Sequence, residues 1–149
     1  MSESEREHAG GCACGAVRYR TSGDLRPVVA CHCSQCRKSL SNYGAFTAVA
    51  RGGLAIDNEA AVTWHESSPG VRRGFCRRCG SALFWDNSAA AHVSIAAGTL
   101  DQPSGLRQVR HIYVADKADF YDIGDGLEQL PQGQTGNPLP SGASGGGGA

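Results

Sequence analysis

The sequence predicts a mostly β domain of short antiparallel strands whose loops are held by zinc knuckles. Two observations lead to this fold class. Between residues 10 and 130, short segments of apolar, β-branched and aromatic residues are separated by glycine, proline and asparagine turn signals. The seven cysteines fall into three tight clusters: Cys12-Ala-Cys14, Cys31-His-Cys33-Ser-Gln-Cys36 and Cys76-Arg-Arg-Cys79. Sulfurs at such short spacings can converge on one ion, and zinc prefers four ligands of this kind in a tetrahedron.

The strands are predicted one by one from alternation and β-branched or aromatic content. The first is 16–21, which alternates after a glycine turn. Further strands are expected at 44–50, 61–65, 73–76, 81–85, 92–96, 111–114 and 119–123. Turn signals separate them at Arg51-Gly-Gly53, Ser68-Pro-Gly70, Asp86-Asn87 and Gln102-Pro-Ser-Gly105. One short helix of one or two turns is expected around 34–39, inside the middle cysteine cluster.

Length, charge and termini limit the class of protein. The 149 residues suit one domain, which we expect at 10–130, after a frayed segment 1–9 and before a disordered Gly/Pro/Ser-rich tail at 131–149. A formal net charge of zero gives no sign of a nucleic-acid or membrane partner. The N-terminus lacks a secretory signal, and no apolar run has transmembrane length. We therefore expect a cytoplasmic protein, in which clustered cysteines bind metal rather than form disulfides.

Seven cysteines divide naturally into four and three. Four thiolates close a structural zinc site, whereas three leave one position for water or a substrate. The middle cluster would leave such an open face unless a histidine completes it. His32 lies between two ligands and should point away from the ion, and the other candidates, His65, His92 and His111, lie in strand-like segments. Spacing favours the open site only narrowly.

Spacing does not decide which cysteines share an ion with Cys76 and Cys79. Pairing with Cys33 and Cys36 would resemble a zinc ribbon, but the intervening stretch is far longer than the roughly 15–20 residues of that motif. Pairing with the Cys12-Ala-Cys14 cluster would join the start of the domain to its middle. Both pairings stay open on these grounds.

Charged residues near the last cluster have two interpretations. The arginines that flank it are Arg72, Arg73, Arg77 and Arg78. Their guanidinium groups could bind an acidic substrate at two points, and Arg37 or Arg72 could steer its carboxylates. The commoner roles are to balance the charge of a zinc–thiolate cluster or to face solvent. Asp101 could transfer a proton, although an aspartate in a turn near a proline is commoner.

The motifs taken together resemble one known family. The likeness runs from Gly10 to about Ile123 and rests on Gly11-Cys-Ala-Cys-Gly-Ala-Val17, Cys31-His-Cys-Ser-Gln-Cys-Arg-Lys38, Phe75-Cys-Arg-Arg-Cys-Gly-Ser-Ala-Leu-Phe84, Gly98-Thr-Leu-Asp101 and His111-Ile-Tyr113 with Lys117. This combination is similar to that of the glutathione-dependent formaldehyde-activating enzymes, which include the centromere protein V relatives. One departure is Phe120, where relatives often carry tryptophan.

The resemblance implies the small zinc-binding β-tent fold with two zinc ions per chain. It implies a structural zinc on Cys12, Cys14, Cys76 and Cys79, and a catalytic zinc on Cys31, Cys33 and Cys36. The implied reaction joins glutathione, as co-substrate, and formaldehyde reversibly into S-(hydroxymethyl)glutathione, which is carbon–sulfur lyase chemistry. Thiol activation is expected over carbonyl polarisation, because three thiolates already make the ion electron-rich. A carbon–sulfur lyase for another thiol adduct, and a zinc-stabilised binding module without catalysis, stay open as alternatives.

Overall fold

A computed structural model describes residues 6–133, and this part of the chain contains eleven β-strands and one α-helix. The larger sheet consists of β3 (Val28–Cys31), β4 (Gly44–Ala50), β6 (Val62–Ser68), β7 (Val71–Cys76), β8 (Ala82–Asn87), β9 (His92–Ala96), β10 (Gln108–Ile112) and β11 (Glu128–Gln129). The smaller sheet consists of β1 (His8–Gly11), β2 (Arg18–Thr21) and β5 (Leu54–Ile56). The prediction of a mostly β domain is confirmed. Within residues 6–133, no helix has the length and hydropathy needed to cross a membrane.

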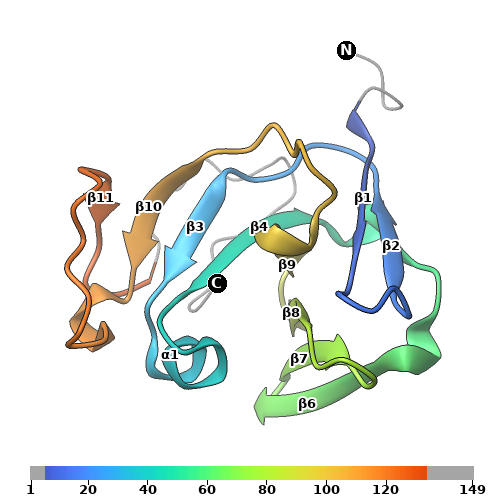
Figure 1. Cartoon of the computed structure of the whole chain (residues 1–149), viewed down its shortest axis with the longest axis horizontal. Coiled ribbons are helices and arrows are strands. Elements are labelled where there is room, and N and C mark those ends of the chain that lie inside the picture. Colours follow the sequence, from blue (N-terminus) through green and yellow to red (C-terminus); the bar gives the residue numbers. More distant parts are fainter. Residues whose placement is uncertain (1–5, 134–149) are drawn as a thin grey trace.

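The larger sheet bends into an arch, and the single helix α1 (Ser34–Leu40) lies at its open side (Figure 1). Its strand order is β11-β10-β3-β4-β9-β8-β7-β6, and the small sheet has the order β1-β2-β5. Helix α1 follows β3 directly and faces β6, the far edge of the arch; Gln35 Nε2 donates to the Ser67 carbonyl at 3.4 Å across this opening. The bend therefore brings the middle cysteine cluster close to strands that are distant in sequence.

The strand pairs are antiparallel except at one edge of the larger sheet. There β10 runs parallel to both β3 and β11, which corrects the expectation of antiparallel strands throughout. A tight hairpin forces antiparallel pairing, whereas strands joined by long connections can pair either way. The chain travels from β3 around the whole arch before it returns as β10, so no turn fixes the direction of this pair.

The first strand begins at His8, inside the segment 1–9 that the sequence predicts to be frayed. His8 and Ala9, which fall in the segment expected to be frayed, belong to β1 and pair with Thr21 and Arg20 of β2. Residues 1–5 lie outside the described part. At Gly10 the backbone approaches Thr99 and Tyr19 so closely that an added Cβ would lie 2.4 Å from the Thr99 carbonyl oxygen. A glycine is needed for this contact between the small sheet and the loop after β9.

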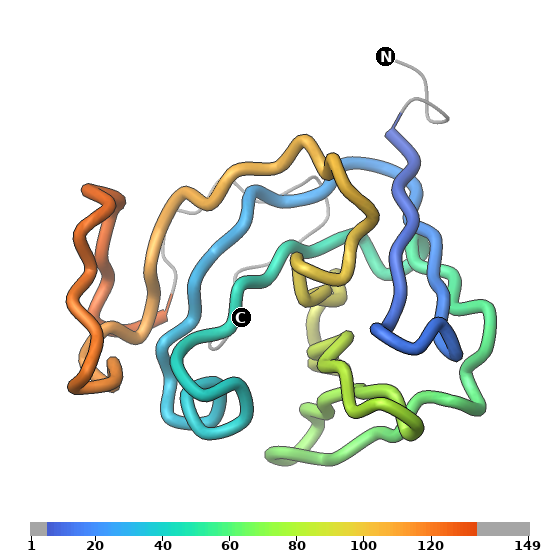
Figure 2. Tube along the Cα trace, in the orientation of Figure 1, coloured from blue at the N-terminus to red at the C-terminus, as the bar shows by residue number. Residues whose placement is uncertain are grey.

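The expected strand at 119–123 does not form. Lys117 instead donates from Nζ to the carbonyls of Ala118, at 3.0 Å, and of Tyr121. These two bonds to nearby carbonyls curl the backbone, and Phe120 is left 72% exposed. Figure 2 shows this segment, in orange to red, looping outside β10 before it returns as β11. Tyr113, with φ of 56°, ends β10 two residues before the predicted end of that strand.

Two buried clusters of apolar side chains form the core, and one of them supports the middle cysteines. The first lies between the small sheet and the arch and includes Tyr19, Leu83 and Ile95. The second contains Cys31 and Cys36 together with Val29, Phe46, Trp85 and Ile112. Two of the three middle cysteines are thus packed into the core. Close packing of this kind fixes their positions before any ion binds.

Backbone hydrogen bonds continue past residue 130, into the stretch assigned to the tail. Tyr113 N donates to the Gln132 carbonyl at 2.9 Å, and Ala115 N donates to the Pro131 carbonyl at 3.4 Å. The rest of the expected tail, 134–149, lies outside the described residues. We therefore expect the boundary that matters for stability to lie at Gly133 rather than at Leu130.

Truncation tests this boundary. Ending the chain after Gly133 should leave the free energy of unfolding unchanged, because every described backbone bond is kept. Ending it after Leu130 should lower that free energy by about 1–2 kcal/mol, since each lost hydrogen bond contributes about 0.5–1.5 kcal/mol. Urea denaturation of the two truncated chains measures the difference. Equal stability of both would show that these two bonds contribute nothing.

Candidate metal centres

The first and last cysteine pairs come together in space. The sulfurs of Cys12, Cys14, Cys76 and Cys79 all lie within 4.8 Å of one another, a group that we call the four-sulfur cluster. Cys14 Sγ is 3.6 Å from Cys12 Sγ and 3.8 Å from Cys76 Sγ. Of the two pairings that spacing left open, the structure has the one that joins the start of the domain to its middle. It ties the β1–β2 turn to the β7–β8 turn.

Two glycine turns point these sulfurs inward. Gly15 and Gly80 follow the two pairs and have φ of 84° and 78°, a backbone conformation that residues with a Cβ rarely adopt. Gly80 N donates to the Cys76 carbonyl at 2.8 Å and closes the second turn. Backbone N–H groups of Val17 and Arg78 then point at the sulfurs of Cys12 and Cys76, at 3.2 and 3.4 Å. Such N–H donors favour the ionised form that a metal requires.

The middle cysteines form a second group, which we call the three-sulfur cluster. The sulfurs of Cys31, Cys33 and Cys36 lie within 4.8 Å of one another. Cys31 ends β3, Cys33 is the N-cap of α1, and Cys36 lies in the first turn of the helix, where its N–H points at Cys33 Sγ at 3.4 Å. A strand end followed at once by a helix start thus turns all three side chains to one point.

Within residues 6–133, no histidine nitrogen or carboxylate oxygen joins the three-sulfur cluster as a fourth potential ligand. His32 points the other way, and its Nε2 lies 2.8 Å from Nδ1 of His111. The donor set is therefore three sulfurs from one loop. On a tetrahedral ion such a set leaves one position for a further ligand.

The charges of the three sulfurs conflict unless a cation is present. Hydrogen bonds from Cys31 and Cys36 lower the pKa of the Cys33 thiol to about 2. Hydrogen bonds with Cys33 and Cys36, together with burial, raise the pKa of Cys31 far above its usual range. Without a cation, ionisation of Cys33 is favoured while ionisation of Cys31 is opposed. A divalent cation removes this conflict, so the donor set fits a metal ion.

A cavity of about 320 Å³ opens beside the three-sulfur cluster. Cys33 lines it, whereas Cys31 and Cys36 are fully buried. Its other walls are Ser34, Gln35, Ser68, Val71, Arg73, Trp85, Asn87, Tyr113 and Asp116. A small polar molecule in this cavity can reach the cluster from the side of Cys33. We call it the Cys33 cavity.

A second cavity, of about 300 Å³, is lined by residues of α1 and of strands β4, β6, β7 and β8 of the arch, several of them apolar. Its walls include Leu40, Phe46, Phe75 and Phe84. Arg73 lines this cavity as well as the Cys33 cavity. The guanidinium of Arg73 thus stands where the two spaces meet, next to the three-sulfur cluster.

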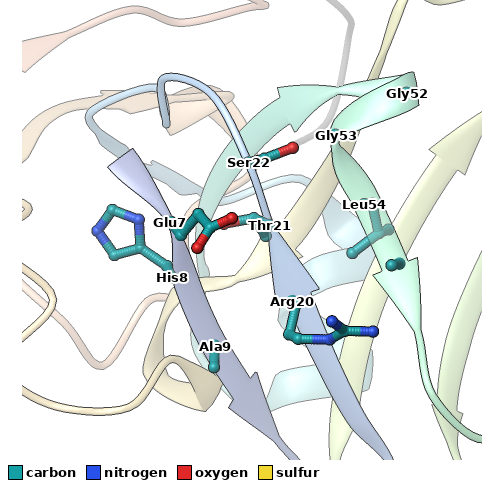
Figure 3. A pocket seen from close by; sticks show the side chains of 10 residues that line it. Glu7, His8, Ala9, Arg20, Thr21, Ser22, Gly52, Gly53 and Leu54 are labelled. Carbon is teal, nitrogen blue, oxygen red and sulfur yellow. The ribbon is translucent and has the colours of Figure 1, made fainter. Parts of the chain in front are cut away.

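A third cavity, of about 390 Å³, lies by β1, β2 and the turn before β5, and no cysteine lines it. Figure 3 shows its polar side chains pointing apart rather than toward a common centre. His8 Nε2 lies 3.2 Å from the Ser104 carbonyl, and Arg20 Nη2 pairs with Asp57 at 3.2 Å. Without a cysteine among its lining residues, and with Arg20 paired to Asp57, this cavity offers no chemistry comparable to that of the cysteine sites.

Behind the three-sulfur cluster, the fully buried His32 and His111 and the more exposed Asp125 form a chain of hydrogen bonds. His111 Nε2 lies 2.8 Å from the Asp125 carboxylate, and that bond lowers the pKa of Asp125. Since a carboxylate only accepts, His111 Nε2 donates to it, and Nδ1 of His111 then accepts from His32 Nε2. Burial lowers the pKa of His32 to about 4, which keeps this ring neutral. The chain connects the loop between two cysteines to β10 and to the segment before β11.

Replacing His111 by glutamine should therefore loosen the cysteine loop. His32 Nε2 would lose its acceptor in a fully buried position, which costs about 1–3 kcal/mol of folding free energy. Asp125→Asn is the matched control, because its amide oxygen can still accept from His111 and the side chain is 37% exposed. Urea denaturation compares the two variants. The same small loss in both would mean that this chain does not anchor the loop.

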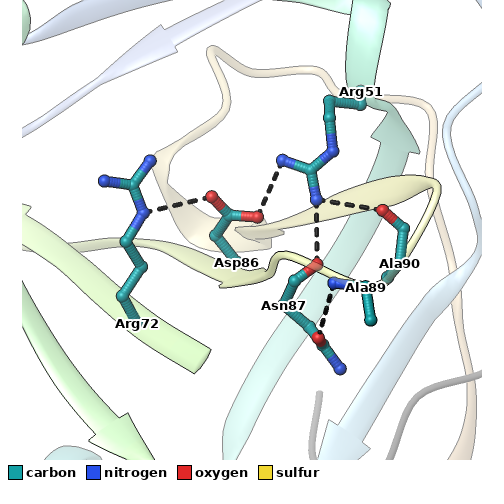
Figure 4. Close-up of polar contacts among 6 residues, drawn as sticks. All are labelled: Arg51, Arg72, Asp86, Asn87, Ala89 and Ala90. Carbon is teal, nitrogen blue, oxygen red and sulfur yellow. Dashed lines mark hydrogen bonds and ion pairs between the residues drawn. The ribbon is translucent and has the colours of Figure 1, made fainter. Parts of the chain in front are cut away.

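Two other charged candidates, Arg72 and Asp101, have structural partners. Arg72 pairs with Asp86 at 3.2 Å and lies 3.8 Å above the Trp64 ring, and Asp86 also binds Arg51 at 2.9 Å (Figure 4). Arg72 does not line the Cys33 cavity. Asp101 pairs with Arg18 through both carboxylate oxygens, at 3.1 and 2.6 Å. Neither residue is therefore placed to steer a substrate or transfer its proton.

Sequence reasoning did not single out two features of this site. Arg73 was one of four equivalent arginines, yet it alone among them donates to a sulfur of the three-sulfur cluster, at 3.5 and 3.6 Å within the described residues. The alternation of β7 places it on the face opposite Arg72, a signal that a correct strand assignment makes available. The pairing of His32 with His111 is a contact between the loop after β3 and β10, and no local pattern reveals it.

Comparisons with known proteins agree with these motifs. The family model of the glutathione-dependent formaldehyde-activating enzyme matches residues 7–116. A protein of Halomonas elongata named for this enzyme is 34% identical, over 76% of this chain and 79% of its own. An uncharacterised lyase of Schizosaccharomyces pombe is 26% identical, over 78% and 85%. A crystal structure of a Rhodobacter sphaeroides protein superposes with a TM-score of 0.52 at 22% identity, over 67% of this chain and 97% of that one, and supports the fold alone.

Proposed function

This chain belongs to the glutathione-dependent formaldehyde-activating enzyme family, and we propose that it is a zinc-dependent carbon–sulfur lyase. The reaction we assign joins glutathione and formaldehyde reversibly into S-(hydroxymethyl)glutathione. The observation that carries the proposal is the three-sulfur cluster with Cys33 on a cavity and no fourth ligand within the described residues. A cavity beside one of the ligands suits an ion with an open position, because a further molecule can then reach that position.

We assign zinc to both clusters from the chemistry of their donors. Cysteine sulfur is the donor that zinc prefers in structural sites, and seven sulfurs in sets of four and three suit two ions per chain. Cys12, Cys14, Cys76 and Cys79 would hold the structural ion, and Cys31, Cys33 and Cys36 the catalytic one. The four-sulfur cluster joins two turns from separate sheets, as expected of an ion that holds a fold together.

In the proposed reaction a thiol loses its proton, its sulfur bonds to the carbonyl carbon, and the carbonyl oxygen takes up a proton. A zinc ion in the three-sulfur cluster would lower the pKa of a thiol bound at its open position and so supply a thiolate near neutral pH. The chain itself supplies the cavity that places the thiol beside Cys33. Gln35, Asn87 and Ser68 offer amide and hydroxyl groups on its walls, and Trp85 offers an apolar surface. We place the reaction in the cytoplasm, where thiols stay reduced.

A kinetic assay tests the proposal. Formaldehyde consumption and adduct formation are followed by proton NMR with glutathione, with and without the full chain, and the protein should accelerate the approach to equilibrium above the uncatalysed rate. N-acetylcysteine in place of glutathione tests the alternative of a lyase for another thiol adduct. Acceleration with N-acetylcysteine but not with glutathione would show that the protein is a lyase for another thiol adduct.

Zinc-edge absorption spectroscopy distinguishes the two lyase hypotheses from that of a zinc-stabilised binding module. The average number of sulfurs per zinc should rise when glutathione is added, because a fourth sulfur joins the three-sulfur site. No acceleration with either thiol, together with four protein ligands on each ion from the start, would leave a zinc-stabilised module without catalysis.

A further inference from the structure

We propose that Arg73 is the positioning residue that compensates the charge of the three-sulfur site and so allows an incoming thiolate to become its fourth sulfur. This inference rests on the proposed function, because it concerns the same open site. It assigns a role to a side chain that the motifs alone did not distinguish from its neighbours.

The contact between Arg73 and the three-sulfur cluster is direct and bidentate. Nη1 and Nη2 of Arg73 lie 3.6 and 3.5 Å from Cys36 Sγ, and Nη2 also donates to Gln35 Oε1 at 3.4 Å. A guanidinium that meets a sulfur with both terminal nitrogens stabilises its ionised form. Cys36 is fully buried, so little water is available to do the same. Arg73 therefore places a positive charge directly against Cys36 Sγ.

Formal charge explains why the site needs this cation. A divalent ion with three thiolates carries one net negative charge, and a fourth thiolate raises that to two. Such a charge is costly in a partly buried site. The guanidinium offsets one of the two charges at the moment the thiol binds and releases its proton to solvent. The four-sulfur cluster differs, because Cys14 and Cys79 are exposed and water solvates its charge.

The position of Arg73 between the cavities agrees with this role. It lines both the Cys33 cavity and the second cavity, so a thiol that approaches the cluster through either space meets the guanidinium. Its Nε is buried without a hydrogen-bond partner within residues 6–133. The hydrogen bonds of this guanidinium in the described part of the chain are thus those of its terminal nitrogens with Cys36 and Gln35.

The test measures thiol binding to the full chain loaded with cobalt(II), whose sulfur charge-transfer absorbance reports each added thiolate. The probes are glutathione and 2-mercaptoethanol, which carries no carboxylate. Arg73→Met should weaken the binding of both thiols by about 10-fold or more, as expected for loss of a charge-assisted bond. Arg73→Lys keeps the charge and should recover part of this loss.

Arg72→Met is the matched control, because it removes the same charge from the other face of β7. Asp86 keeps Arg51 as a partner in that variant, so the fold should hold (Figure 4). Thiol binding by Arg72→Met should equal that of the unchanged protein. Circular dichroism and metal analysis confirm that each variant is folded and loaded before it is compared.

The outcomes separate this inference from the proposed function. Weakening of glutathione alone would overturn it, since Arg73 would then bind the carboxylates of the substrate. Equal weakening in Arg73→Met and Arg72→Met would also overturn it. If the unchanged protein binds neither thiol, the proposed function fails, and the affinity of the three-sulfur site for cobalt, from chelator competition, decides the role of Arg73. That affinity should fall about 10-fold in Arg73→Met, and no fall would overturn the inference.

Discussion

Replacing Cys79 by serine should cost the protein most of its stability. The four-sulfur cluster joins the turn after β1 in the small sheet to the turn after β7 in the larger one. Binding of a structural zinc contributes folding free energy directly, because the unfolded chain has no preformed site. The loss of one of four sulfurs should therefore cost several kcal/mol out of the roughly 5–15 kcal/mol that stabilises a domain. Thermal denaturation monitored by circular dichroism measures it.

Cys79 is suited to this experiment because it is exposed. Its replacement leaves no cavity in the core, whereas Cys76 is fully buried and its loss would disturb packing as well. Cys14→Ser, also at an exposed position, should give the same loss. After metal is removed by a chelator, the unchanged protein and both variants should melt at one temperature. A difference that persists in the metal-free proteins would show that the destabilisation does not come from an ion.

The sequence indicated the central strands of the arch where side chains alternate or are β-branched. The predicted ranges for β4 and β9, 44–50 and 92–96, coincide with the observed strands. Strand β3 was missed because its residues, Val28–Cys31, are all buried and so do not alternate. Strand β1 was missed because two of its four residues are glycines, which have low strand propensity. Pairing with other strands forms both: β3 lies between β4 and the distant β10, and β1 forms a hairpin with β2.

The membership of each cysteine cluster was predictable only in part. The short spacing within Cys31–Cys36 placed those three sulfurs together, and the structure agrees. Spacing could not choose a partner for Cys76 and Cys79, because that choice depends on how the small sheet lies against the arch. The resemblance to a family supplied the pairing. The contact of Arg73 with Cys36 depends on the same bend of the sheet, which no local pattern encodes.

Replacing Cys33 by serine should abolish most of the activity and leave the fold nearly unchanged. Cys33 is the N-cap of α1, and its sulfur accepts from Cys36 N. Serine is a favoured N-cap residue, so its hydroxyl takes over this bond. The change removes one of three ligands from the open site while it keeps the helix start. We expect the rate of the glutathione–formaldehyde reaction to fall about 100-fold or more. Mutating a residue that only hydrogen-bonds to a metal ligand already lowers metal affinity or activity by about 10–100-fold.

Stability tells whether the two clusters divide their roles in this way. Cys33→Ser should lose less than about 1 kcal/mol, while Cys33→Ala, which removes ligand and cap together, should lose about 1 kcal/mol more. Both should be equally inactive, because neither supplies the sulfur. Metal analysis should find the four-sulfur site still filled in each. If Cys33→Ser melts as early as Cys79→Ser, or keeps full activity, then the three-sulfur cluster is a structural site and the assignment of the catalytic ion is wrong.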